Sequence, residues 1–107
     1  MIGSLSKRIM LESNFKVDNG RGGFTFTYDE LGEYWAAILP LSNAEIVRYK
    51  QAKIEATARI IIRYNPDLTG KLLNGRAYHG LIRYDIVSEL DSADNKDYIE
   101  LLAVTRI

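Results

Sequence analysis

Alternating apolar and polar positions run through most of the chain and predict short β-strands. A first strand is expected over residues 8–12, continuing toward Phe15 and Val17. Residues 24–28 alternate aromatic residues with threonines, and this period of two predicts a strand that buries its aromatic face in the core. Residues 34–41 are apolar at both parities, which is typical of a central or covered strand, and Pro40 predicts the end of its ladder.

A short helix is predicted directly after this strand. Ser42 and Glu45 have the spacing of a capping box, which predicts a helix over about residues 43–51. So short a helix is marginally stable alone in water, and we expect it to dock on its own barrel or on a neighbouring chain. Its exposed residues are expected to include the basic side chains Arg48, Lys50 and Lys53.

The second half of the chain returns to strand patterns separated by turn signals. Residues 57–64, 82–86 and 98–105 each place apolar residues on a common face, and residues 65–67 and 78–80 carry the proline or glycine of a turn. Six or seven short strands, one short helix and a turn signal about every ten residues predict a mainly β fold, a small barrel or sandwich. We expect one domain over residues 1–107.

Composition narrows the function classes. The chain has 107 residues, no cysteine and a formal net charge of zero. The absence of cysteine excludes disulfides and thiolate chemistry, and the neutral charge argues against general affinity for nucleic acid or an anionic membrane. No apolar run approaches the length of a membrane span, and the first residues lack a signal-peptide core. The expectation is a soluble intracellular protein with no membrane partner.

The charges are distributed in blocks. Residues 42–83 hold eight basic and three acidic side chains, net +5, whereas residues 84–107 hold two basic and six acidic ones, net −4. Such blocks favour copies that meet head to tail, basic face against acidic face, although they can also simply solvate two surfaces. The residues that could form inter-subunit charge patches are Arg59, Arg63, Asp91, Asp94 and Asp97.

Candidate chemistry is sparse. His79 is the sole histidine and lies beside a turn glycine, with no base or orienting partner evident. The acidic residues of the segment 91–97 lack the glycine and terminal glutamate of an EF-hand loop, so we expect a solvated loop. The glycines of residues 18–23 are not followed by the Lys-Ser/Thr of a phosphate-binding loop. We therefore predict no catalytic residue, no metal site, no cofactor and no enzyme.

Nucleic-acid binding by a small barrel remains a rival interpretation. Seven tyrosines, three phenylalanines and fourteen basic residues would suit base stacking in a single-strand binder. The expected burial of Phe24, Phe26 and Tyr28 argues against this interpretation, and sequence-independent DNA contact would fall to the basic segment 48–63.

A series of short motifs occurs in a fixed order along nearly the whole chain. They are Arg8-Ile9 with Leu11; Asp18 with Gly22-Gly23; Trp35-Ala36 with Ile38, Pro40-Leu41-Ser42 and Glu45; Ile60-Ile61-Ile62-Arg63-Tyr64; Leu68-Thr69; Tyr78-His79-Gly80 with Tyr84-Asp85-Ile86-Val87; and Glu100-Leu101-Leu102. In this order they resemble the tailed-phage head–tail joining proteins, also called head-closure or stopper proteins. The run from Trp35 to Glu45 is the most specific part, and His79 departs from the acidic residue or asparagine usual there.

The resemblance implies a small β-barrel that assembles as a six- or twelvefold ring beneath the portal and its adaptor. Such a ring closes the DNA channel after packaging and gives the tail a docking surface, and it can need its partner ring as a template, so that the isolated protein is a monomer. The expected place is the virion neck, with assembly in the host cytoplasm. The expected partners are other copies, the portal or adaptor protein, a tail-completion or tail-tube protein, and packaged double-stranded DNA.

The resemblance also assigns a role to the segment after the Pro-Leu-Ser turn. In this kind of protein it points toward the channel or a neighbouring subunit. The residues expected to act there are Asn43, Glu45, Arg48, Tyr49, Lys50, Lys53 and Glu55. Residues 43–57 hold three basic and two acidic side chains, and this mild positive charge suits a gate that must hold DNA and later release it. Another neck component, a tail-completion or terminator protein, is the alternative.

Overall fold

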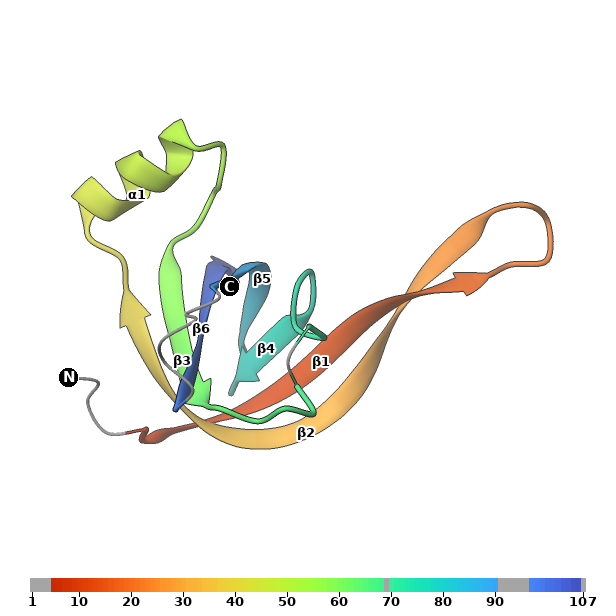
Figure 1. Cartoon of the computed structure of the whole chain (residues 1–107), viewed down its shortest axis with the longest axis horizontal. Helices are drawn as coiled ribbons and strands as arrows, with labels where there is room; N and C mark the ends of the chain where they lie inside the picture. The colour runs from red at the N-terminus through yellow and green to blue at the C-terminus, as the bar shows by residue number, and fades with distance from the viewer. Residues whose placement is uncertain (1–4, 69, 91–96, 107) are drawn as a thin grey trace.

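A computed structural model describes residues 5–68, 70–90 and 97–106, and it confirms a mainly β fold. Six antiparallel strands close into a barrel in the order β1-β2-β3-β6-β5-β4, with one helix outside it (Figure 1). The elements are β1 Lys7–Asp18, β2 Phe24–Pro40, α1 Asn43–Gln51, β3 Ala58–Arg63, β4 Arg76–His79, β5 Ile82–Leu90 and β6 Tyr98–Arg106.

The barrel interior is filled by aliphatic side chains from every strand. Its largest fully buried members are Ile9, Leu11, Ile60, Ile62, Leu68, Leu72, Ile86 and Leu101. In β3 and β6, residues at alternate positions face this interior, as the period of two in the sequence predicts. Ile61, Leu102 and Val104 are also buried, although they lie on the outer side of the barrel. Leu102 packs there in a cluster with Leu41 and Ala56.

The β1–β2 hairpin extends far beyond the barrel. β2 runs unbroken for 17 residues, so the two separate strands expected at residues 24–28 and 34–41 are one, and Asp29, Glu30 and Gly32 do not interrupt it. The ladder absorbs these residues with a β-bulge, because Leu11 pairs with Gly32 and Glu12 with Glu30, which leaves Leu31 as the extra residue. Gly32 has φ +113°, a backbone conformation that favours glycine at the bulge.

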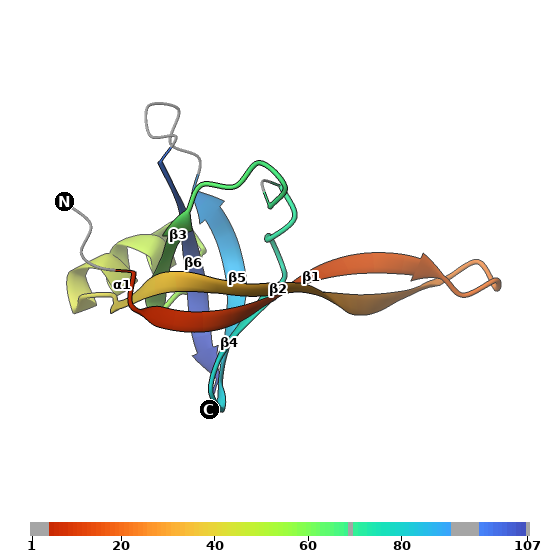
Figure 2. The ribbon, with the colours of Figure 1, turned by 90° about the horizontal axis from the view of Figure 1, so that it is seen from below.

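The hairpin leaves the barrel where β4 stops pairing with β1. β4 pairs only with Met10 to Glu12, and beyond Glu12 β2 is the single neighbour of β1 among the described residues. At this junction a Cβ on Gly75 would lie 2.3 Å from the Glu12 carbonyl oxygen, so the chain requires glycine there. We call residues 13–30 the hairpin arm, which projects away from the barrel in two perpendicular views (Figures 1 and 2).

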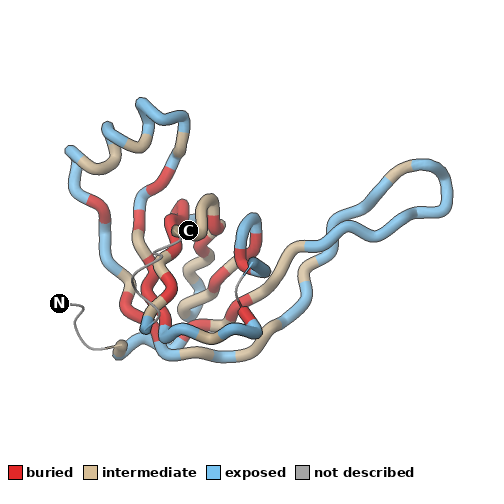
Figure 3. The backbone as a smooth tube through the Cα atoms, in the orientation of Figure 1, coloured by how far each residue is buried: buried red, intermediate tan, exposed pale blue. Residues whose placement is uncertain are grey.

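The burial expected for the aromatic strand 24–28 is wrong. Phe24 and Phe26 each expose 62% of their surface, and Phe15 and Val17 on the other strand are exposed too. The tube coloured by burial shows the outer part of the arm as a continuous exposed segment (Figure 3). Aromatic residues and threonines do alternate between the two faces of this strand. The other barrel strands do not extend along the arm, however, so no core lies against its aromatic face.

The outer face of β2 is covered only in part, so the expectation that residues 34–41 are central or covered holds at Ala37, which is buried, and fails at Trp35 and Leu39. Ala36 is fully buried, whereas Trp35 and Leu39 are about half exposed. The strand ends at Pro40, as predicted.

The β4–β5 hairpin closes with a tight turn at Gly80, whose φ of +62° suits glycine, and His79 pairs with Ile82 across it. In the described part of the chain, no helix is both long and apolar enough to cross a bilayer.

Candidate assembly surfaces

The helical excursion, residues 43–57, leaves the barrel between β2 and β3. Ser42 forms the predicted capping box: its Oγ accepts a hydrogen bond from the Glu45 backbone N–H at 3.2 Å, and the Glu45 carboxylate accepts from the Ser42 N–H at 3.4 Å. The helix spans the predicted residues, and none of them is buried. The two ends of the excursion stay close, because the Leu41 N–H donates to the Thr57 carbonyl at 3.0 Å.

A small apolar cluster fixes the base of the excursion to the outer side of the barrel. Leu41, Ala56 and Leu102 are buried in it, and Leu102 has no exposed surface. The half-buried side chains of Ile46, Tyr49, Ile54, Val87 and Leu90 pack around these three. This is a second core, separate from the barrel interior, and it holds α1 by one face only.

An ionic cluster reinforces this contact. The Arg59 guanidinium lies 3.1 Å from the Glu45 carboxylate on α1 and 3.8 Å from the Glu100 carboxylate on β6. Arg59 and Glu100 belong to the basic and acidic sequence blocks, and so do Arg83 and Asp85, whose side chains are 3.0 Å apart. Part of the charge complementarity seen in the sequence is therefore satisfied within one chain.

The surroundings shift the pKa values of this cluster. The hydrogen bond from the Ser42 backbone, followed by the Ser42 hydroxyl and the charge of Arg59, lowers the pKa of Glu45 despite some desolvation. Burial is the largest single influence on Arg59 and lowers its pKa, but the hydrogen bond with Tyr49 and the carboxylates of Glu100 and Glu45 together raise the pKa of the guanidinium. Both groups are charged at neutral pH, and the pair is partly exposed to water.

Apart from Tyr49, the other residues expected at the channel lie on the exposed side of the excursion. Tyr49 is half-buried against the barrel, whereas the rest face solvent: Asn43, Arg48, Lys50, Lys53 and Glu55. Glu45 is engaged with Arg59, so the solvent-facing charges of the excursion are three basic groups and one acidic group. Lys53 follows the helix with φ +63°, where the chain turns back toward the barrel.

The candidate charge patch residues fall in different places. Arg59 is held in the cluster described above, whereas Arg63 is exposed at the end of β3. Asp97 precedes β6 and is exposed. Asp91 and Asp94 lie outside the described residues. Within the described ranges, no three metal-binding side chains converge.

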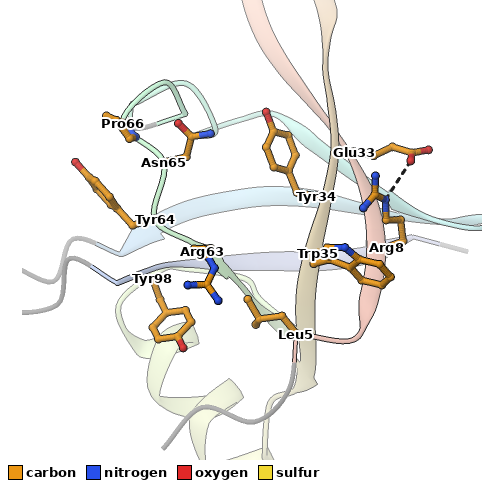
Figure 4. Close-up of a pocket in the computed structure, with 10 residues that line it drawn as sticks. All are labelled: Leu5, Arg8, Glu33, Tyr34, Trp35, Arg63, Tyr64, Asn65, Pro66 and Tyr98. Atoms are coloured by element: carbon orange, nitrogen blue, oxygen red, sulfur yellow. Dashed lines mark hydrogen bonds and ion pairs between the residues drawn. The ribbon is translucent and has the colours of Figure 1, made fainter.

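An open groove lies beside the part of β2 that precedes its pairing with β3. It has a volume of about 750 Å³ and is lined by Leu5, Arg8, Glu33, Tyr34, Trp35, Arg63, Tyr64, Asn65, Pro66 and Tyr98. Residues of β1 and β2 form one wall, and the segment leaving β3, together with Tyr98, forms the other (Figure 4). The groove arises because β3 pairs with β2 only from Ala36 onward, so the preceding part of β2 has no neighbour on that edge.

The Arg8 side chain orders the first wall of the groove through two contacts. The Arg8 guanidinium lies 5.1 Å from the centre of the Trp35 ring and donates to the Glu33 carboxylate at 3.1 Å. Sequence reasoning missed both this groove and the exposed aromatics of the hairpin arm. The length mismatch between β2 and its neighbours produces both, and that mismatch depends on pairing that the sequence pattern does not specify.

The chain matches the model of the phage head completion protein family over residues 1–106. It belongs to this family. The resemblance drawn from the sequence motifs is thereby confirmed, and the protein is a structural protein of the phage head and neck. None of the curated proteins matches the chain.

Two solved structures share the fold. Protein SF1141 from Shigella flexneri 2a has 21% sequence identity and a TM-score of 0.72, with 96% of this chain and 94% of that chain covered. A chain of the virion of the native gene transfer agent particle has 18% identity and a TM-score of 0.62, with 95% and 94% covered. At these identities the similarity establishes the barrel architecture.

Proposed function

We propose that this phage head completion protein forms a ring at the virion neck, below the portal and adaptor, where it closes the DNA channel after packaging and offers the tail its docking surface. The helical excursion supports this proposal most strongly. It is anchored at its base by a small apolar cluster and one partly exposed ionic cluster, yet it buries no residue of α1. Such a segment can change position while the barrel stays folded.

The charge on the excursion suits contact with packaged DNA. Arg48, Lys50 and Lys53 face solvent, with Glu55 as the one exposed acidic side chain of the excursion. This small positive excess attracts the phosphate backbone without the many contacts that would hold DNA against release. Copies of the barrel in a ring would place several such excursions around one channel.

The experiment replaces residues 43–55 with an Asn-Gly turn. Leu41 and Thr57 are already hydrogen-bonded neighbours, so a short hairpin can join β2 to β3, and keeping Ala56 preserves the cover over Leu102. We expect a folded barrel that is incorporated into particles, with heads that package DNA and then lose it to added nuclease. A chain carrying Lys71→Gln, on an exposed position away from the excursion, is the matched control.

Normal DNA retention by particles that contain the shortened chain would contradict the closure role. Unjoined tails of aberrant length in particles that lack the chain would instead assign it to tail completion or termination. The electron-microscopic phenotype of the gene deletion therefore separates the two neck functions.

Single-strand nucleic-acid binding is a second candidate, because the exposed Phe24 and Phe26 remove the argument from burial. Lys16 lies over the Phe24 ring at 5.5 Å, which resembles a stacking platform. The arm is nevertheless net acidic, with Asp18, Asp29 and Glu30 against Lys16 and Arg21. A binding titration decides between the readings: phosphate contacts would lose affinity steeply with salt, and we expect no measurable binding at physiological salt.

A further inference from the structure

The hairpin arm presents apolar side chains that the described chain leaves largely exposed, although Lys16 lies over the Phe24 ring. Directly paired residues of an antiparallel ladder share a face, so Phe24 and Phe26 lie beside Asp18 and Lys16 on one face of the arm. Phe15 and Val17 lie on the other face. Two phenylalanines at 62% exposure on a projecting two-stranded ribbon are costly to leave in water, and an isolated ribbon is only marginally stable.

The groove has room for the phenylalanine rings of the arm and an aromatic lining that suits them. A cavity of roughly 150 Å³ is enough for one benzene ring, and the groove measures about 750 Å³. Its walls offer the aromatic rings of Tyr34, Trp35, Tyr64 and Tyr98, and Trp35 is 53% exposed. Aromatic rings pack favourably edge to face, so phenylalanines are suitable occupants.

The charges of the two surfaces are complementary. Among the described residues, Arg63 in the groove and Asp18 on the arm each have no ion-pair partner. Asp18 pairs directly with Phe24 in the ladder, and Arg63 precedes Tyr64. Glu33 in the groove is already paired with Arg8, so Asp18 and Arg63 are the ion pair that docking would complete.

We propose that the Phe24/Phe26 face of the hairpin arm docks into the groove of a second copy of this chain. The proposal rests on the ring proposed above and names the two surfaces that join its subunits. Phe24 lies nine residues before Glu33 on the same strand, about 30 Å away in an extended chain, so one copy cannot reach its own groove with the outer part of its arm. The arm projects away from the barrel in Figure 1. The contact is heterologous: each copy gives its arm to one neighbour and receives the arm of the other, which generates a closed ring when the rotation closes.

Photo-crosslinking in assembled particles tests this contact. Benzoylphenylalanine replaces Phe24, an exposed aromatic position, and purified particles are irradiated and analysed by gel and peptide mass spectrometry. We expect bands at multiples of the chain mass, with crosslinked peptides that contain Trp35 or Tyr64. The same probe at Leu81, a fully exposed position in the β4–β5 turn, is the matched control and should give no such band.

A groove variant sharpens the test. Adding Tyr64→Ala to the Phe24 probe should reduce the crosslinked fraction at least about fivefold, because a central aromatic contact is lost. Leu73→Ala, which truncates a half-exposed leucine outside the groove, should leave the crosslinked fraction unchanged.

The outcomes separate this proposal from the proposed function. Particles that contain the chain but show no crosslink between copies, or show crosslinks to another neck protein or to DNA, would overturn the docking proposal and leave the neck role intact. Particles that lack the chain altogether would overturn both.

Discussion

The helical excursion and the hairpin arm both leave the barrel, but the barrel holds them differently. The excursion has a capping box, an ionic cluster and its own small apolar core. The arm is held by its ladder and, at its base, by the Arg76 guanidinium stacked 3.6 Å from the centre of the Tyr28 ring. The excursion therefore makes its contacts within its own chain, whereas the phenylalanines of the arm remain mostly exposed.

A substitution in the apolar cluster at the base of the excursion should have the largest effect on the free energy of unfolding. Leu102→Ala removes a fully buried side chain from the second core and should lower the free energy of unfolding by about 3 kcal/mol. Leu73→Ala makes the same chemical change at a half-exposed position and is the control. Urea unfolding measures both variants. A loss below about 1 kcal/mol for Leu102→Ala would mean that the excursion has no core of its own.

Loss of the helix cap should affect the excursion alone. Ser42→Ala removes the side-chain oxygen that accepts from the Glu45 N–H and should destabilise α1 by about 1 kcal/mol. Hydrogen exchange of the α1 amides should then be about fivefold faster, with β3 and β6 unchanged. Ser42→Asp, which keeps an N-cap acceptor, should restore slow exchange. Faster exchange throughout the barrel would contradict an independently opening excursion.

Acid should weaken the contacts of the Glu45 carboxylate with Ser42 and Arg59. The pKa of Glu45 is lower in the folded chain than its ordinary value of 4.5, so its ionised form contributes stability above that value. This contribution is lost as the pH falls from about 4.5 through the lowered pKa, because the unfolded chain then binds the proton more readily. We expect α1 exchange to accelerate in this range, and Glu45→Gln to remove that dependence. A pH profile identical in the two proteins would exclude this pair as the cause.

The arm should show the smallest effect on stability. Phe24→Thr with Phe26→Thr keeps β-forming residues in the ladder and removes only the uncovered rings, so the free energy of unfolding should change by less than about 0.5 kcal/mol. The assembly of particles should nevertheless fail or become inefficient. A loss of more than about 2 kcal/mol in the isolated chain would show that the arm packs on its own barrel.

Local rules predicted most of the fold. The capping box at Ser42 and Glu45 predicted α1 correctly, and Pro40 predicted the end of β2, because both effects depend on neighbouring residues alone. Alternation also predicted the buried face of β3, where Ile60 and Ile62 lie in the core. The mainly β barrel follows from these elements and their turn signals.

The same alternation misled at Phe24 and Phe26. A period of two says which residues share a face, but not whether anything covers that face. Coverage depends on where β4 stops pairing with β1, and this is a long-range property of the barrel. The groove around Trp35 was missed for the same reason, since it exists only where β3 fails to follow β2. Arg59 was assigned to an inter-subunit patch from its block of charge, and the structure adds its ion pairs within the chain.

A reconstruction of the virion neck by electron microscopy tests the central claim most directly. The account predicts a ring of these barrels below the portal and adaptor, with the helical excursion of each copy facing the channel and each hairpin arm seated in the groove of its neighbour. A ring whose excursions all face outward, away from the DNA channel, would contradict it.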